Sequence, residues 1–191
     1  MKQGLFLVAL FFCVSAICYA QEPMPSTSTV MEQALAQAGK SKKKVLLIFH
    51  ASWCGWCKKM EASLNDPDCK KMFDDNYVIT TLDVLESKGK ENLENPGAMD
   101  QLKKYKGEKA GLPFWVILDA KGNVLADSQI RPAGAGLDAP GENTGCPSAP
   151  NEVAYFIKVL KATSKLKDAE LAVIEKRFIK NQPVVRDAKS R

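Results

Sequence analysis

Two cysteines three positions apart, Cys54 and Cys57, lie in the segment SWCGWCKKM, residues 52–60. Cysteines at this spacing could bind a metal, form a structural disulfide or exchange electrons as a dithiol. A zinc site needs four ligands, and the chain offers neither a second CxxC pair nor a histidine pair, because His50 is its only histidine. An inert bridge over so short a loop would gain little stability from loop entropy. The spacing therefore favours thiol–disulfide exchange.

The segments around this pair place the first cysteine at the start of a helix. The run KVLLIFHA, residues 44–51, is continuously apolar and of strand length, and CKKMEASLN, residues 57–65, has a helical pattern. The N-terminus of a helix carries unpaired N–H groups and the positive end of the helix dipole, which stabilise a thiolate. We therefore expect Cys54 to be the attacking nucleophile and Cys57 to resolve the mixed disulfide.

Residues 1–20 have the layout of a secretory signal peptide. Lys2 precedes an apolar run from Leu5 to about Ile17, and small residues at the end predict cleavage between Ala20 and the next residue. An uncleaved membrane anchor is the alternative, although the run is short for a membrane span. We expect a mature protein without membrane insertion, located in the periplasm or outside the cell.

Length and composition limit the number of domains in the mature chain and the kinds of partner it can bind. Removal of the signal leaves 191 − 20 = 171 residues, which is enough for one domain with a sizeable core. The full chain has 27 basic and 22 acidic residues, so without Lys2 the net charge is 26 − 22 = +4. This excess is small and is not interleaved with aromatic residues, so nucleic acid is not an expected partner. The four remaining cysteines allow three pairings in an oxidising compartment.

The mature chain alternates between helical and strand patterns. We expect a flexible leader over residues 21–28, one domain over residues 29–165, and a C-terminal helix and tail over residues 166–191. The predicted order is α-β-α-α-β-α-β-β-α-α, a mixed sheet between helices, with an inserted helix near residues 67–75. Residues 131–150 are rich in Gly, Pro and Ala and are expected to form a long loop.

Three boundaries follow from glycine and proline. The first helix, VMEQALAQAGKSKK, is expected to stop at Gly39, and a later helix, NPGAMDQLKKYKG, to open at Pro96. The segment LPFWVILDAKGNVLADS is expected to be a hairpin that turns at residues 121–123.

With these motifs in order, the chain resembles the secreted thioredoxin-like proteins of bacteria over about residues 29–165. The resemblance implies a thioredoxin-like α/β fold, with a mixed central sheet flanked by helices and a C-terminal helical extension. It also implies a thiol:disulfide oxidoreductase. The segments that carry it are VLLIF, ASWCGWCK, the strand ending at Asp83, NPGAMDQLKKYKGEKAGLPFWVILDAKGNVL and GENTGCPSAPNEVAYFI.

The resemblance also implies roles for individual residues. Cys54 matches the attacking cysteine and Cys57 the resolving one. Pro113 matches a cis-proline that faces the disulfide, and the neighbouring backbone at Leu112 is offered to an extended substrate chain. A proline at the first position of a strand agrees with this assignment. The expected substrate-binding residues are Trp53, Gly55, Trp56, Leu112 and Pro113.

One departure from the family concerns the proton of the resolving thiol. Familiar thioredoxins carry a buried aspartate and, on the adjacent strand, a lysine, where this chain has Ile48 and Ile79. In the family that carboxylate helps to remove the proton, so Cys57 must use water, His50 or a group of the partner. His50 is therefore an auxiliary candidate, and packing at the end of its strand is the alternative.

The other two mature cysteines suggest a structural bridge. Cys69 starts the short helix after NDP, and Cys146 lies in the Gly- and Pro-rich segment. A bridge would close a loop of 146 − 69 + 1 = 78 residues and would stabilise the fold by about 4 to 5 kcal/mol. Two buried free thiols are the alternative.

The expected function is thiol–disulfide exchange on disulfide-containing exported proteins, with no bound cofactor and no metal. The Gly55-Trp56 pair between the cysteines offers little stabilisation of the thiolate, which favours a reductase. By resemblance, a membrane-embedded thiol donor would supply the electrons. The alternatives are an isomerase or oxidase of the same fold, a copper-delivery module using Cys54, Cys57 and His50, and a non-catalytic binding scaffold.

Overall fold

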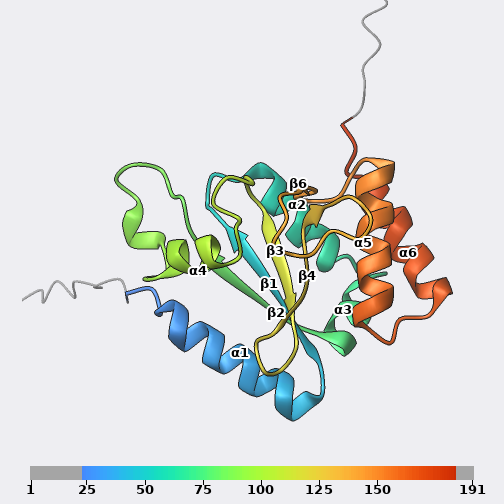
Figure 1. Ribbon diagram of the computed structural model, residues 1–191, viewed down its shortest axis with the longest axis horizontal. Helices are drawn as coiled ribbons and strands as arrows, with labels where there is room; N and C mark the ends of the chain where they lie inside the picture. Colours follow the sequence, from blue (N-terminus) through green and yellow to red (C-terminus); the bar gives the residue numbers. More distant parts are fainter. Residues whose placement is uncertain (1–22, 184–191) are drawn as a thin grey trace, which may run out of the picture.

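A mixed four-stranded sheet forms the centre of the computed structural model, which describes residues 23–183 (Figure 1). The predicted signal peptide lies outside the described residues. Within residues 23–183, no helix has the length and apolar character needed to cross a membrane. The strands, in their order across the sheet, are β2 (Tyr77–Asp83), β1 (Lys44–His50), β3 (Phe114–Leu118) and β4 (Val124–Asp127).

Strand β1 is the central strand that positions the site. It pairs in parallel with β2 and antiparallel with β3, and its five inner residues are all buried. This explains its continuous apolar run, because both faces of the strand are covered. The parallel register places His50 opposite Asp83 at the carboxyl ends of β1 and β2.

Helices cover both faces of the sheet. Residues Val45, Leu47 and Phe49 of β1 face α1 (Thr27–Ser41) and α4 (Ala98–Lys104). The alternate residues of β1 face the other layer, because successive side chains of a strand point to opposite faces. This second layer consists of α2 (Gly55–Leu64), α3 (Lys70–Asn76), α5 (Pro150–Thr163) and α6 (Asp168–Ile179).

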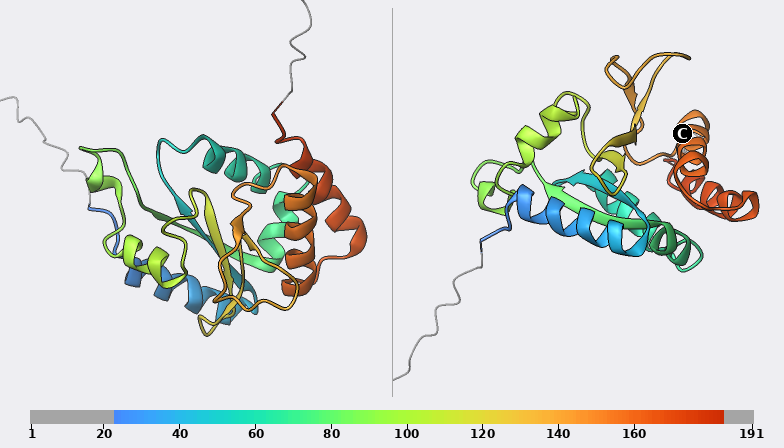
Figure 2. Two further views of the ribbon diagram at one scale, coloured as in Figure 1. Left: turned by 45° about the horizontal axis from the view of Figure 1, so that its top comes forward. Right: turned by 60° about the horizontal axis from the view of Figure 1, so that its bottom comes forward.

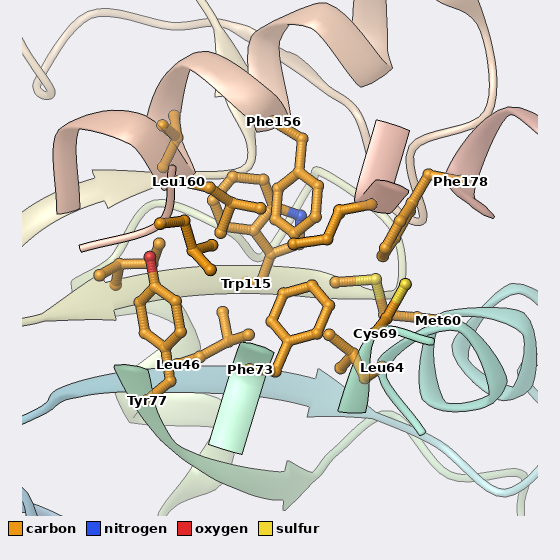
Figure 3. Close-up of a cluster of buried hydrophobic side chains, with 14 of the residues drawn as sticks. Leu46, Met60, Leu64, Cys69, Phe73, Tyr77, Trp115, Phe156, Leu160 and Phe178 are labelled. Carbon is orange, nitrogen blue, oxygen red and sulfur yellow. The ribbon is translucent and has the colours of Figure 1, made fainter. Parts of the chain in front are cut away.

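The core beneath α5 and α6 is aromatic. Figure 3 shows Trp115, Phe156 and Phe178 together, and the ring centroids of Phe156 and Phe178 are 4.9 Å apart. The rings of Trp115 and Phe156 meet edge to face at 5.3 Å. Helices α5 and α6 lie side by side (Figure 2), so the C-terminal helix is packed into the same core as the sheet.

The predicted element order and the β3–β4 hairpin are confirmed, whereas several boundaries differ. Helix α1 begins at Thr27, inside the expected leader, because the Ser26 side chain accepts a hydrogen bond from the Thr29 N–H and caps it. It also continues past Gly39 and ends at Ser41, and the following residue, Lys42, has a left-handed backbone that lets its N–H reach the Gly39 carbonyl. Helix α4 starts at Ala98, after Pro96 rather than at it.

The segment predicted as a long loop, residues 131–150, contains one short strand, and a second short strand directly precedes it. β5 (Gln129–Ile130) and β6 (Glu142–Asn143) pair antiparallel and form a second sheet. A single helical turn, η1 (Glu91–Leu93), was also not predicted. Both features are too short to leave a periodic pattern in the sequence.

Candidate active site

Cys54 and Cys57 form a disulfide at the beginning of helix α2. Cys54 is the residue that caps the helix, and the two Cα atoms are 5.3 Å apart. The backbone N–H of Cys57 donates a hydrogen bond of 3.1 Å to the sulfur of Cys54. The predicted position of the first cysteine at a helix N-terminus is therefore what the structure shows, and the unpaired N–H groups there favour a thiolate on Cys54.

The disulfide lies below a rim of tryptophans. Both cysteines are 2% exposed, whereas Trp53 is 54% and Trp56 38% exposed. The indole N–H of Trp53 donates to the Leu85 carbonyl at 2.7 Å, which holds its ring at the rim. Large apolar side chains at the surface next to a reactive pair are typical of a docking surface.

The loop before β3 forms the opposite wall. The Leu112–Pro113 peptide bond is cis, and Leu112 packs against the cluster that contains both cysteines. Trp56, Gly111 and Leu112 line a groove of about 300 Å³ together with residues 143–146. The structure thus brings the expected substrate-binding residues Trp56 and Leu112 together with the disulfide.

Asn143 of β6 is a residue of this wall that sequence analysis missed. Its side-chain amide donates to the Ala110 carbonyl at 2.8 Å and to the Pro113 carbonyl at 3.2 Å. The hairpin that carries it therefore fastens the loop beside the disulfide. No sequence signal pointed to Asn143, because its contact depends on how residues 131–142 fold back.

His50 and Asp83 form a pair on the inner side of the disulfide. Their Nδ1 and Oδ1 atoms are 2.6 Å apart, and each side chain is about one quarter exposed. Both residues and Cys57 line one cavity of about 410 Å³. The sequence predicts only that Asp83 ends its strand. The sequence signal for this pair is that one predicted strand has a histidine near its end and the next one ends in an aspartate.

Glu86 braces the residues just before the cysteine pair. Its carboxylate accepts hydrogen bonds from the backbone N–H of Ser52 and, at 2.7 Å, from the Ser52 hydroxyl. Partial burial acts to raise the pKa of Glu86, but these hydrogen bonds outweigh it and hold the pKa below the usual 4.5. A charged Glu86 therefore helps to fix the turn that leads into Cys54.

Cys69 and Cys146 are both free thiols, so the expected bridge between them is not formed in the structure. Cys69 caps α3 and is packed in the core near Met60 (Figure 3), whereas the sulfur of Cys146 lies 3.4 Å from the side-chain amide of Asn181. Burial raises the pKa of Cys69 and raises that of Cys146 to about 12. Both remain protonated at neutral pH and are poor nucleophiles.

Among residues 23–183, no group of three or more histidine, cysteine or carboxylate side chains is placed to hold a metal ion.

Comparison with known proteins identifies the domain. The model of a family described as Thioredoxin-like matches residues 27–120. None of the curated proteins compared matches the chain.

Solved structures with a similar chain path include three redox proteins. A disulphide isomerase from Xylella fastidiosa Temecula1 is 22% identical, with 59% of this chain and 80% of that chain covered and a TM-score of 0.45. An oxidoreductase named DsbH is 24% identical, with 86% and 96% covered and a TM-score of 0.44. The oxidised C-terminal domain of Neisseria meningitidis DsbD is 22% identical, with 73% and 98% covered and a TM-score of 0.43. At these values the structures assign neither a substrate nor a direction of electron flow to this chain.

Residues 27–120 form a thioredoxin-like domain. Its Cys54–Cys57 disulfide at the start of α2 is a redox-active CxxC pair. The fold and the site together define a thiol:disulfide oxidoreductase.

Proposed function

We propose that this oxidoreductase works as a disulfide reductase on exported proteins. The observation that carries the proposal is the set of groups around the Cys54 sulfur, which the structure shows in its disulfide form. Among residues 23–183, one hydrogen bond reaches this sulfur, from the backbone N–H of Cys57. The side chain between the cysteines, Trp56, brings no charge to it. A thiolate that is only moderately stabilised gives a low, reductase-like potential, because a strong oxidant owes its potential to a stabilised reduced form.

The groove beside the disulfide suits an extended polypeptide as substrate. Its lining includes Trp56, Leu112 and residues 143–146. A disulfide in an extended segment could approach the Cys54 sulfur, while the exposed tryptophans contact its neighbouring side chains. The proposed clients are therefore disulfide-containing proteins rather than small thiols alone.

The compartment and the electron donor follow from the N-terminal sequence. The predicted signal peptide of residues 1–20 supports export to the periplasm or beyond. A reductase in an oxidising compartment must be re-reduced after each turnover. We therefore include a membrane-embedded thiol donor in the proposal, as expected from the family resemblance.

Equilibration with glutathione tests the direction. We expect the Cys54/Cys57 pair to have a midpoint potential near the roughly −270 mV of thioredoxin. A potential above about −180 mV would assign the protein to the isomerases or oxidants instead. A Cys54→Ser variant is the control, because it removes the couple and should abolish the equilibrium with glutathione at this site.

A further inference from the structure

The second half of the exchange reaction requires a proton acceptor near Cys57. After Cys54 has formed a mixed disulfide, Cys57 must lose its proton, because the thiolate is the nucleophile. Cys57 is 2% exposed and packs with Ala51 and Leu112 on the side of the rim. The proton therefore needs a route other than direct contact with bulk water.

The inner side of Cys57 offers such a route. Cys57, His50 and Asp83 line the same cavity of about 410 Å³, which is large enough for several water molecules. The wall nearest the sheet includes Ile48, which is apolar and cannot take a proton. His50 brings an imidazole to this cavity, the side chain that most often transfers protons in catalysis.

The contact with Asp83 prepares His50 for this role. A carboxylate oxygen only accepts, so Nδ1 of His50 is the donor in the 2.6 Å contact with Asp83, and in the neutral ring Nε2 is the nitrogen left to take up a proton. The register of β1 and β2 fixes both Cα positions opposite each other. A negative carboxylate at this distance also stabilises the imidazolium that forms when Nε2 takes up a proton.

We propose that His50, oriented by Asp83, accepts the proton of the Cys57 thiol through water in this cavity during resolution of the mixed disulfide. This inference rests on the proposed exchange reaction. Cys57 loses its proton to Nε2 of His50, and its sulfur forms the bond to the Cys54 sulfur. The bond between Cys54 and the substrate sulfur breaks, and the substrate leaves with the electron pair and takes up a proton. His50 then returns its proton to water.

Other charged groups face the same cavity and define the competing explanation. Glu61 of α2 lies one turn beyond Cys57 on the same face of the helix, and it is exposed. Lys70 and Asp74 of α3 are paired with each other at 2.6 Å. Glu61 is therefore the alternative acceptor that an experiment must separate from His50.

The two chemical steps can be timed separately by rapid mixing of the reduced protein with a nitrobenzoate disulfide whose thiol product is coloured. The first thiol reports attack by Cys54, and the second reports resolution by Cys57. We expect His50→Ala to leave the first release within about two-fold of wild type and to slow the second about 10²-fold at pH 7. Asp83→Asn should slow the second release about ten-fold, because it weakens the orientation of the imidazole.

Three readouts separate proton transfer from a structural effect. The second release in His50→Ala should depend more steeply on hydroxide concentration than that of wild type, because no side chain at position 50 is left to take the proton. Added imidazole should restore the rate in His50→Ala, and pyrrole, a ring of similar size without a basic nitrogen, should not. Thr80→Val, the neighbouring position of β2, which does not line this cavity, is the matched control and should leave both releases unchanged.

The outcomes distinguish this inference from the proposed function. A wild-type protein that releases no thiol would overturn the exchange reaction itself. A normal first release with an unchanged second release in His50→Ala would overturn the proton transfer alone. Slowing of the second release by Glu61→Gln, and not by His50→Ala, would assign the proton to Glu61 instead.

Discussion

Asp127 and Arg131 form a two-point ion pair that is almost completely buried between β4 and the hairpin of β5 and β6. The Nη1–Oδ1 and Nη2–Oδ2 distances are 2.7 Å and 2.8 Å, and the side chains are 5% and 6% exposed. Arg131 also donates to the carbonyls of Ala139, at 2.6 Å, and Leu137, at 3.0 Å. One guanidinium therefore organises the segment that carries Asn143 to the active site.

Replacing Arg131 with methionine should destabilise the fold by about 3 to 5 kcal/mol, because it leaves the Asp127 carboxylate buried without its partner. Urea unfolding at pH 7 measures the change. Lys161→Met is the matched control, since the Lys161–Asp168 pair is exposed and should contribute less than about 1 kcal/mol. Equal effects of the two substitutions would show that Arg131 does not organise the hairpin.

The contact between Glu86 and Ser52 should make the free energy of unfolding depend on pH in the acidic range. The pKa of Glu86 is lower in the folded protein than its usual 4.5, so its contribution is fully present above pH 4.5. The contribution is lost as the pH falls through the folded value. At pH 7, Glu86→Gln should be less stable than wild type by about 1 kcal/mol, and the difference should shrink towards zero as the pH falls below the pKa of Glu86 in the folded protein.

Urea unfolding of both proteins across this pH range gives the comparison. Glu108→Gln provides a control at an exposed glutamate and should change stability little at either pH. A difference between wild type and Glu86→Gln that grows on acidification would contradict the sign of the pKa shift.

The sequence predicts those parts of the site whose structure depends on a single, continuous segment of the chain. The cap position of Cys54 follows from an apolar strand directly before a helical pattern, and both patterns are local. The contact of Leu112 with the cysteine pair and the cis bond before Pro113 were expected from a family resemblance rather than from periodicity. The central strand was also evident, because burial on both faces leaves a continuous apolar run.

The parts that sequence does not predict depend on register and on irregular segments. The pairing of His50 with Asp83 requires β1 and β2 to be neighbours and to align without an offset. The sequence of neither strand determines its neighbour or its register. The expected bridge between Cys69 and Cys146 was inferred from their compartment and loop length. The folded chain instead surrounds each sulfur with its own core neighbours, so pairing could not be read from the spacing.

Thiol reactivity should follow the four cysteine environments. In the reduced protein, limiting iodoacetamide at neutral pH should label Cys54 first, because the start of α2 stabilises its thiolate. Cys69 and Cys146 should react only after unfolding, since burial raises the pKa of both. Mass spectrometry of the labelled peptides measures the order, and a Cys57→Ser variant should accumulate mixed disulfides with client proteins.

Two results would contradict this account of the cysteines. Equal labelling of Cys54 and Cys57 would remove the distinction between attacking and resolving thiols. A peptide that joins Cys69 to Cys146, isolated from the non-reduced protein, would restore the bridge that the structure does not contain.

The residue between the cysteines should set the potential. Trp56 presents an apolar ring to the rim of the groove, and the ammonium of Lys59 lies 4.1 Å from its centroid. This cation–π contact holds the ring against the helix surface and adds no donor to the Cys54 sulfur. Trp56→His would place a polar, chargeable ring there instead. It should stabilise the thiolate and raise the midpoint potential by at least about 30 mV, equivalent to about 1.4 kcal/mol.

Equilibration with glutathione measures the potential of Trp56→His beside wild type. Trp53→His is the matched control, because it makes the same exchange at a rim tryptophan outside the CxxC loop. We expect it to shift the potential less, since the Trp53 indole is directed to the Leu85 carbonyl rather than to the disulfide. A fall in potential for Trp56→His, or equal shifts for both variants, would show that the intervening side chain does not control the Cys54 thiolate. The backbone N–H groups at the start of α2 would then be the main influence on the potential.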